Sequence, residues 1–217
     1  MEKIGGNMNI IWVIREICAK DSFESLFDFH KSYSKIIDLS NNKKDATCFT
    51  AMIYGKARAT LIELIHDAYR YETYIKKIKS DLIAGGQYED EATRAIEIFL
   101  EAFGFPGFRK MDDDKVDTII TENGDFRTEY TGEVRDGKEH GVGIKTLYYQ
   151  GNWCNYYETV WVDGTMCGYE YAKEMEFGIY EDKKIGFVVN NSLIGKARVF
   201  ASSGEEFNDL GKELNIE

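Results

Sequence analysis

The chain has 217 residues, of which 43% are hydrophobic and 30% are charged. This composition excludes intrinsically disordered, collagen-like and disulfide-scaffold proteins. The formal net charge of −11 argues against nucleic-acid binding, because phosphate contacts need a surplus of Lys and Arg, so any charged partner is expected to be basic.

Apolar residues recur three and four positions apart through the first half of the chain, the spacing of amphipathic helices. We expect the second helix to have Asp21 or Ser22 as its N-cap, the third to bend at Gly55, and a turn at Gly85-Gly86 to separate the last two. The pattern predicts a small bundle of about five helices, over residues 10–19, 22–37, 46–69, 74–84 and 89–103.

The second half differs in charge and in period. Residues 1–110 contain 16 Lys and Arg against 16 Asp and Glu, whereas residues 111–217 contain 11 against 22. The boundary follows Gly104-Phe105-Pro106-Gly107, which includes the only proline. Beyond it, Tyr, Phe, Trp and Val alternate with polar residues between frequent turn residues, which predicts successive β-hairpins.

An internal repeat runs through this half. The segments 130–143 and 157–170 superpose at an interval of 27 residues, and we expect two weaker copies with inward apolar residues at Ile179 and Val188. The tight turns would then fall at residues that tolerate a left-handed backbone, namely Gly137, Gly164, Asp182 and Asn191. A second glycine, expected close beneath an aromatic ring of a neighbouring hairpin, recurs at Gly141, Gly168, Gly186 and Gly195.

The strongest copy, Tyr130-x-Gly132-x-Val134-x-x-Gly137-x-x-x-Gly141-x-Gly143, resembles the MORN motif (membrane occupation and recognition nexus), Tyr-x-Gly-x-Trp-x-x-Gly-x-x-x-Gly-x-Gly. The next copy keeps Trp161 but has Thr159 and Glu170 in place of two glycines. The resemblance covers residues 120–200 and implies a stack of antiparallel hairpins that binds proteins and has no catalysis of its own. MORN arrays are also associated with anionic lipid, but the negatively charged second half of this chain would be repelled by an acidic membrane leaflet.

Two sets of residues are candidates for a binding surface. Neighbouring strand residues point to opposite faces, so we expect one tyrosine to be exposed in each of the pairs Tyr148-Tyr149 and Tyr156-Tyr157, with Trp161 as a further aromatic anchor. Carboxylates would steer a basic partner, and the candidates are Glu133, Asp136 and Asp163. The alternative roles are packing between hairpins for the rings and solvation of an exposed strand face for the carboxylates.

The cysteines are isolated from one another and from histidine, at Cys18, Cys48, Cys154 and Cys167. We therefore expect reduced, partly buried thiols, no metal or other cofactor, and a cytoplasmic location. The apolar run 10–14 is too short for a membrane span.

Together these features predict an α+β protein, with an α-helical bundle over residues 1–110 followed by an acidic, MORN-like antiparallel β-hairpin meander over residues 111–217. The leading hypothesis is a cytoplasmic, bacterial, non-enzymatic interaction or scaffold protein. Its acidic, aromatic-rich sheet would bind another protein with a basic surface, and would bind no nucleic acid, membrane or anionic lipid directly. A sharper version is an immunity or anti-defence factor that occludes a basic toxin or nuclease.

Two alternatives remain open. The first is an enzyme whose site forms between the helices and the sheet, with Glu63, His66 and Asp67 as candidate residues. No local nucleophile, metal or phosphate-binding motif supports it, although scattered residues can converge in space. The second is a homodimeric adaptor that associates through its helical half.

Overall fold

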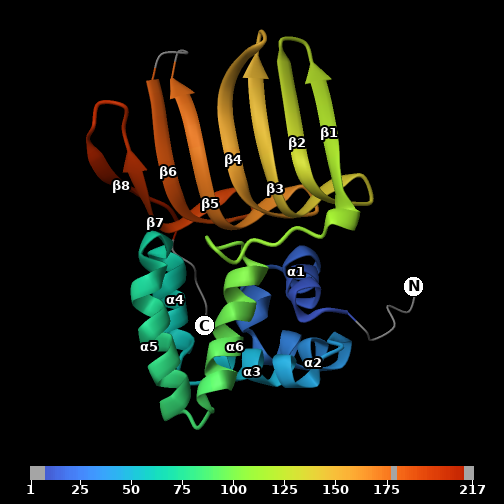
Figure 1. Ribbon diagram of the computed structural model, residues 1–217, viewed down its shortest axis with the longest axis vertical. Helices are drawn as coiled ribbons and strands as arrows, with labels where there is room; N and C mark the ends of the chain where they lie inside the picture. The colour runs from blue at the N-terminus through green and yellow to red at the C-terminus, as the bar shows by residue number, and fades with distance from the viewer. Residues whose placement is uncertain (1–7, 177–179, 213–217) are drawn as a thin grey trace. The chain divides into compact units, whose positions relative to one another are not determined.

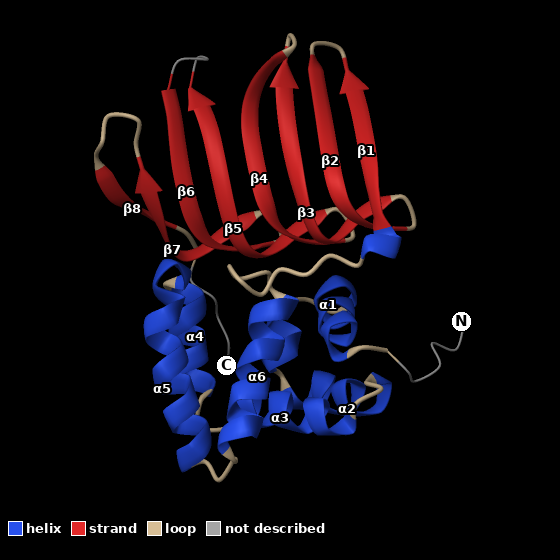
Figure 2. Cartoon of the chain, viewed as in Figure 1, coloured by secondary structure: helices blue, strands red, loops and turns tan. Residues whose placement is uncertain are grey.

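The computed structural model describes residues 8–176 and 180–212, which form two compact units. Within the described residues, the helical unit comprises 8–66 and 70–102, and the sheet unit comprises 67–69, 103–176 and 180–212. Helices precede strands throughout (Figure 2), which confirms the predicted α+β class.

The described part of the helical half contains six α-helices, against about five predicted. The additional helix arises at Gly55, where the expected bend is a complete break between two helices. The elements are α1 (Ile10–Lys20), η1 (Glu24–Phe27), α2 (Phe29–Leu39), α3 (Lys43–Tyr54), α4 (Arg58–His66), η2 (Ala68–Arg70), α5 (Tyr71–Ala84) and α6 (Glu89–Ala102).

The second helix begins later than the sequence predicts. Ser22 accepts a hydrogen bond from the backbone of Ser25, but this bond closes only the short η1 turn. The N-cap of α2 is Asp28, whose carboxylate accepts hydrogen bonds from two backbone N–H groups of the first helical turn. The prediction of Asp21 or Ser22 as N-cap was therefore wrong.

Buried aliphatic and aromatic side chains form the core of the helical unit, and α3 and α6 are joined by a charge pair. Arg94 of α6 donates to both carboxylate oxygens of Asp45 on α3, at 3.2 and 2.7 Å. Such a two-bond contact fixes the register of two helices as well as their attraction. Apolar packing in the interior, together with this ion pair, therefore stabilises the helical unit.

The sheet unit is a single antiparallel sheet in which each strand pairs with the next along the chain (Figure 1). A short 3₁₀ turn, η3 (Asp113–Lys115), precedes the first strand. The strands are β1 (Val116–Asn123), β2 (Phe126–Arg135), β3 (Lys138–Tyr149), β4 (Asn152–Val162), β5 (Thr165–Glu176), β6 (Tyr180–Val189), β7 (Ser192–Phe200) and β8 (Glu206–Leu210). The predicted hairpin meander is thus confirmed for the described residues.

Turns at one end of the sheet recur every 27 residues. They fall at Asp136-Gly137, Asp163-Gly164 and Asn190-Asn191, and both residues of each turn have positive φ. Type I′ turns require this conformation, and Asp-Gly and Asn tolerate it. The turn roles predicted for Gly137, Gly164 and Asn191 are confirmed.

The copy aligned on Ile179 and Asp182 was wrong. Asp182 lies within strand β6, opposite Glu174, and not in a turn. Ile179 itself lies outside the described residues. The described sheet accordingly contains three hairpins of the 27-residue repeat, with turns 137, 164 and 191, in place of the four predicted copies.

Register shifts bend the sheet at a similar point in each repeat. They lie between Gly132 and Val134, between Glu158 and Trp161, and between Ile185 and Phe187. Such irregularities curve a strand and increase its twist, and the longer strands curve visibly along their length (Figure 2).

Residues paired across neighbouring strands share one face of the sheet. The tyrosine face is defined by the cross-strand series Tyr130, Lys145, Tyr157, Ala172, Lys184 and Val199. The opposite, linker face carries Glu158, Tyr169 and Phe187. Phe103 and Phe105, which precede the sheet, pack on this face with ring centroids 5.7 Å from Phe187 and 5.0 Å from Tyr169, respectively.

On the tyrosine face, a close approach requires glycine at position 143. A side chain there would overlap the ring and hydroxyl group of Tyr130, which is 1% exposed. The prediction of an aromatic ring over the second glycine is therefore wrong at Gly141, Gly168 and Gly186. The ring lies over Gly143 and belongs to the same hairpin, and the group closest to Gly168 is the backbone carbonyl of Phe103. At Gly141 the approaching group is the Glu133 carboxylate, and at Gly186 it is the side chains of Leu193 and Ala197.

Gly143→Ala is expected to lower the free energy of unfolding by about 2 kcal/mol, because the added methyl group overpacks a filled site. Urea unfolding followed by tryptophan fluorescence measures the loss. Adding Tyr130→Ser should make the alanine nearly neutral. Equal costs of Gly143→Ala in the presence and absence of Tyr130 would contradict the packing described.

Candidate functional site

The structure places Glu133 and Trp161 in the interior of the sheet unit. Glu133 is 2% exposed, and its carboxylate accepts hydrogen bonds from the backbone N–H groups of Asp112 and Val142, both at 2.7 Å. Trp161 is 3% exposed, and its Nε1 donates to the carbonyl oxygen of Gly143. Both residues stabilise the fold, and neither offers its side chain as an exposed surface.

The two aspartates predicted as surface charges differ from each other. Asp136 is exposed in the first repeat turn. Asp163 accepts from Arg135 at 2.6 Å and lies 3.1 Å from Nδ1 of His140, which is fully buried. Partial burial acts to raise the pKa of Asp163, but Arg135 and His140 outweigh it and hold the pKa below its ordinary value. The Asp163 carboxylate thus interacts mainly with Arg135 and His140 at the turn, which leaves little of its charge to attract a partner.

The paired tyrosines follow the predicted alternation in one case only. Tyr149 is 42% exposed while Tyr148 is half-buried. Tyr156 and Tyr157 are both half-buried, on opposite faces. Tyr156 donates to Glu158 at 3.2 Å, and burial, followed by the charge of Glu158, raises the pKa of its phenol.

An exposed aromatic pair lies at the end of the sheet opposite the repeat turns. Phe126 and Tyr149 are cross-strand neighbours with ring centroids 4.9 Å apart, and Phe126 is 59% exposed. Beside them, the Arg127 guanidinium lies 5.8 Å from the centroid of the Tyr148 ring. We call these four residues the aromatic rim.

A cavity of about 400 Å³ opens at the aromatic rim. The turns that frame it are joined, because Gln150 donates through its backbone to the carbonyl oxygen of Asp125 at 2.8 Å and through its side chain to the carboxylate at 3.1 Å. Glu122 and Asp125 contribute negative charge to the lining. At this end of the sheet, aromatic rings and carboxylates therefore lie on two turns that are joined by hydrogen bonds.

A second feature lies in the middle repeat, on the tyrosine face. Glu170 is 5% exposed, and burial raises its pKa from 4.5 to about 7, with Lys184 opposing the rise and Glu174 adding to it. Tyr157 and Thr159 lie on the same face of β4, where the pairing of β4 with β5 shifts in register. Burial and the charges of Glu174 and Glu170 also raise the pKa of Tyr157, so the phenol stays neutral.

Sequence reasoning did not select Glu170 as a site residue, although a signal was present. At the 27-residue interval, Gly132, Thr159 and Gly186 are equivalent, and so are Gly143, Glu170 and Ala197. Only the middle repeat has polar side chains at these two positions. Their neighbourhood and their burial depend on the register of β4 and β5, which the sequence alone does not specify.

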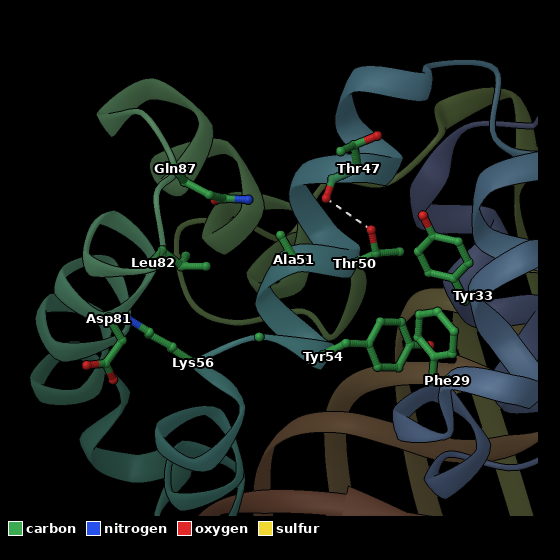
Figure 3. Close-up of a pocket in the computed structure, with 12 residues that line it drawn as sticks. Phe29, Tyr33, Thr47, Thr50, Ala51, Tyr54, Lys56, Asp81, Leu82 and Gln87 are labelled. Atoms are coloured by element: carbon green, nitrogen blue, oxygen red, sulfur yellow. Dashed lines mark hydrogen bonds between the residues drawn. The ribbon is translucent and has the colours of Figure 1, made fainter.

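The helical unit contains a cavity of about 440 Å³ between α2, α3 and α5 (Figure 3). Phe29 and Tyr33 stack at 4.6 Å on one side. On the other side the charged groups bond internally, since Lys56 donates to the Ala84 carbonyl oxygen and Asp81 accepts from Thr60. The cavity thus offers mainly its aromatic side to a ligand.

The described residues contain no group of three or more His, Cys, Asp or Glu side chains suited to a metal ion. None of the helices in the described ranges is sufficiently long and apolar for a transmembrane span. The prediction of buried cysteines is confirmed for Cys18, Cys48 and Cys167.

The candidate residues for the enzymatic alternative occupy the end of α4 and the residue after it. Glu63 is exposed and pairs with Lys77, and His66 and Asp67 are half-buried. Comparison with known proteins adds no assignment: no family model matches the chain, and no curated protein matches its sequence.

Proposed function

We propose that this chain is a non-catalytic, cytoplasmic protein-binding module whose MORN-like sheet binds a partner with a basic surface. The observation that carries the proposal is the aromatic rim, in which Phe126 and Tyr149 remain exposed although their rings contact each other. Exposed aromatic rings are frequent anchors of protein interfaces, because they bury a large area at a low entropic cost.

Charge supports a basic partner. The half of the chain that contains the sheet has twice as many Asp and Glu as Lys and Arg. Glu122 and Asp125 line the cavity at this end of the sheet together with Phe126, Arg127 and Tyr148. Complementary charge accelerates association and orients the partner, while the rings supply the contact area.

Recovery of partners from the native host tests this proposal. The double variant Phe126→Ala/Tyr149→Ala should lose the partner that the tagged wild-type chain retains, with at least a tenfold drop in recovery. Because both side chains are exposed, the free energy of unfolding should change by under about 1 kcal/mol. Quantitative mass spectrometry of crosslinked complexes measures recovery.

Tyr88→Ala is the matched control, since Tyr88 is 74% exposed but belongs to the helical unit. It should leave recovery unchanged. Raising the ionic strength should weaken the wild-type complex, because the attraction between exposed charges is screened. A partner retained equally by the rim variant would refute the assignment of the binding surface.

A further inference from the structure

The middle repeat contains a buried carboxyl group that the rest of the sheet leaves without a hydrogen bond. Among the described residues, Glu170 accepts no hydrogen bond at its side chain, and the fully buried Thr159 hydroxyl has no partner. A fully buried hydroxyl without a partner is uncommon in folded proteins, because such a group loses its hydrogen bonds to water and gains none in return. The Thr159 hydroxyl, next to a largely buried carboxyl group, therefore requires an explanation beyond packing.

The register places these groups together. Glu158 pairs with Tyr171 in the last cross-strand pair of β4 and β5 before the register shift, and Thr159 and Glu170 are the next residues on the two strands. Their equivalents in the first repeat, Gly132 and Gly143, pair directly, which places Thr159 and Glu170 close together on the tyrosine face. Ala172 in turn pairs with Lys184 on β6. Tyr157, Thr159, Glu170 and Lys184 therefore surround a single position on the sheet.

The charged groups that face Glu170 leave its negative charge largely uncompensated. Glu174, on the same strand, repels it. Lys184 attracts it, but the Lys184 ammonium group bonds to Asp209 of β8 at 2.5 Å. Tyr157 is neutral, and its hydroxyl oxygen accepts a hydrogen bond from Asn155. The site is thus rich in acceptors, and its own cation, Lys184, is shared with Asp209.

We infer that Glu170, Thr159 and Tyr157 form a receptor for one cationic side chain, lysine or arginine, of the protein partner. The carboxylate would form a charge-assisted hydrogen bond, the Thr159 hydroxyl would accept a second, and the Tyr157 ring would contact the cation. This inference rests on the proposed function, because it identifies residues that would hold a side chain of the protein partner. Because only the ionised carboxylate binds the cation, capture by the protonated form releases its proton, and binding strengthens as pH rises through the pKa of Glu170.

Comparison of the repeats supports a specific role. The first and third repeats have the small residues Gly143 and Ala197 where the middle repeat has Glu170. In the first repeat, the space above the small residue is filled by Tyr130. The middle repeat thus replaces internal packing with a carboxyl group at the centre of the face.

Capped Gly-Lys-Gly and Gly-Arg-Gly peptides probe the site directly in the full chain. NMR shift changes at the amides of Thr159 and Glu170 should saturate, with a dissociation constant about tenfold lower at pH 8 than at pH 6, given a pKa of about 7. The relative affinities of the two peptides tell lysine from arginine. Capped Gly-Gln-Gly should cause no saturable change.

Single substitutions distinguish the residue that binds the cation from the residues around it. Glu170→Gln should weaken binding at pH 8 at least tenfold and abolish its dependence on pH, while Thr159→Val should weaken it about threefold. Glu174→Gln, which alters an exposed neighbouring carboxylate, should retain binding. Absence of saturable shifts at pH 8, or equal binding by Glu170→Gln, would overturn the inference.

The rim variant keeps this test distinct from that of the proposed function. Phe126→Ala/Tyr149→Ala should still bind the capped peptides, because its changes lie at the end of β2 and β3. If the rim variant loses the partner but the peptides do not bind wild-type protein, the Glu170 receptor fails and the proposed function stands. If the peptides bind as expected but rim changes do not affect the partner, the rim assignment fails alone.

Discussion

Glu133→Ala is expected to lower the free energy of unfolding by about 4 kcal/mol, the largest effect of any single change considered. The carboxylate accepts from the backbone N–H groups of Asp112 and Val142. Its removal would leave the buried Val142 donor and the partly buried Asp112 donor without their acceptor, each at a cost of about 1–3 kcal/mol, together with the cavity left by the side chain. Urea unfolding with tryptophan fluorescence measures this loss.

Glu133→Gln keeps an acceptor for only one of the two donors, and should lose about half as much stability. Glu129→Ala, on the same strand, removes a partly exposed carboxylate that lies 3.5 Å from the Arg127 guanidinium, and should change stability by under about 1 kcal/mol. A Glu133→Ala variant as stable as Glu129→Ala would show that Glu133 is a surface charge. Reversal of Glu133 to lysine is consequently a test of folding and not of partner steering.

The second large effect has the opposite sign: Glu170→Gln is expected to stabilise the protein by about 3 kcal/mol at pH 8. Burial raises the pKa of Glu170 from 4.5 to about 7, so the native state binds a proton more tightly than the unfolded state. Wild-type stability must therefore fall as pH rises from about 4.5 to 7, and a shift of this size corresponds to about 3 kcal/mol. Glutamine lacks this dependence.

Unfolding at a series of pH values measures the difference between Glu170→Gln and wild type. The advantage of the variant should be small at pH 4, grow through the interval from 4.5 to 7, and level off above it. Glu174→Gln is the matched control and should show no comparable gain, because Glu174 is exposed. A destabilising Glu170→Gln at pH 8 would mean that the carboxylate has a stabilising partner in the folded protein.

The sequence predicts the architecture well because the signals involved are local. The change from helical to alternating periodicity follows the Gly-Pro segment, and the left-handed turns at Gly137, Gly164 and Asn191 depend on residue type alone. The repeat copy wrongly placed at Asp182 also results from relying on residue type alone. Aspartate tolerates a left-handed backbone as well as an extended one, so only strand pairing shows that it lies within β6.

The candidate site is less predictable because it depends on register and burial. Alternation along β2 would turn Glu133 outward, but the register shift between Gly132 and Val134 accompanies its burial. In the sequence, Glu170 is marked only by the fact that the equivalent residue of the first repeat is a glycine, Gly143. Its raised pKa arises from burial among several strands, which the sequence does not reveal. Tyr149 is the exception, since exposure at a strand end follows directly from alternation.

The NMR shift of the Glu170 carboxyl carbon, followed as a function of pH in the full chain, reports the protonation of this buried group. We expect a midpoint of about 7, which moves to lower pH when capped Gly-Lys-Gly or Gly-Arg-Gly is added. A midpoint at the ordinary value of 4.5 or below, unaffected by either peptide, would contradict this expectation. Such a result would mean that Glu170 is solvated or already paired within the sheet.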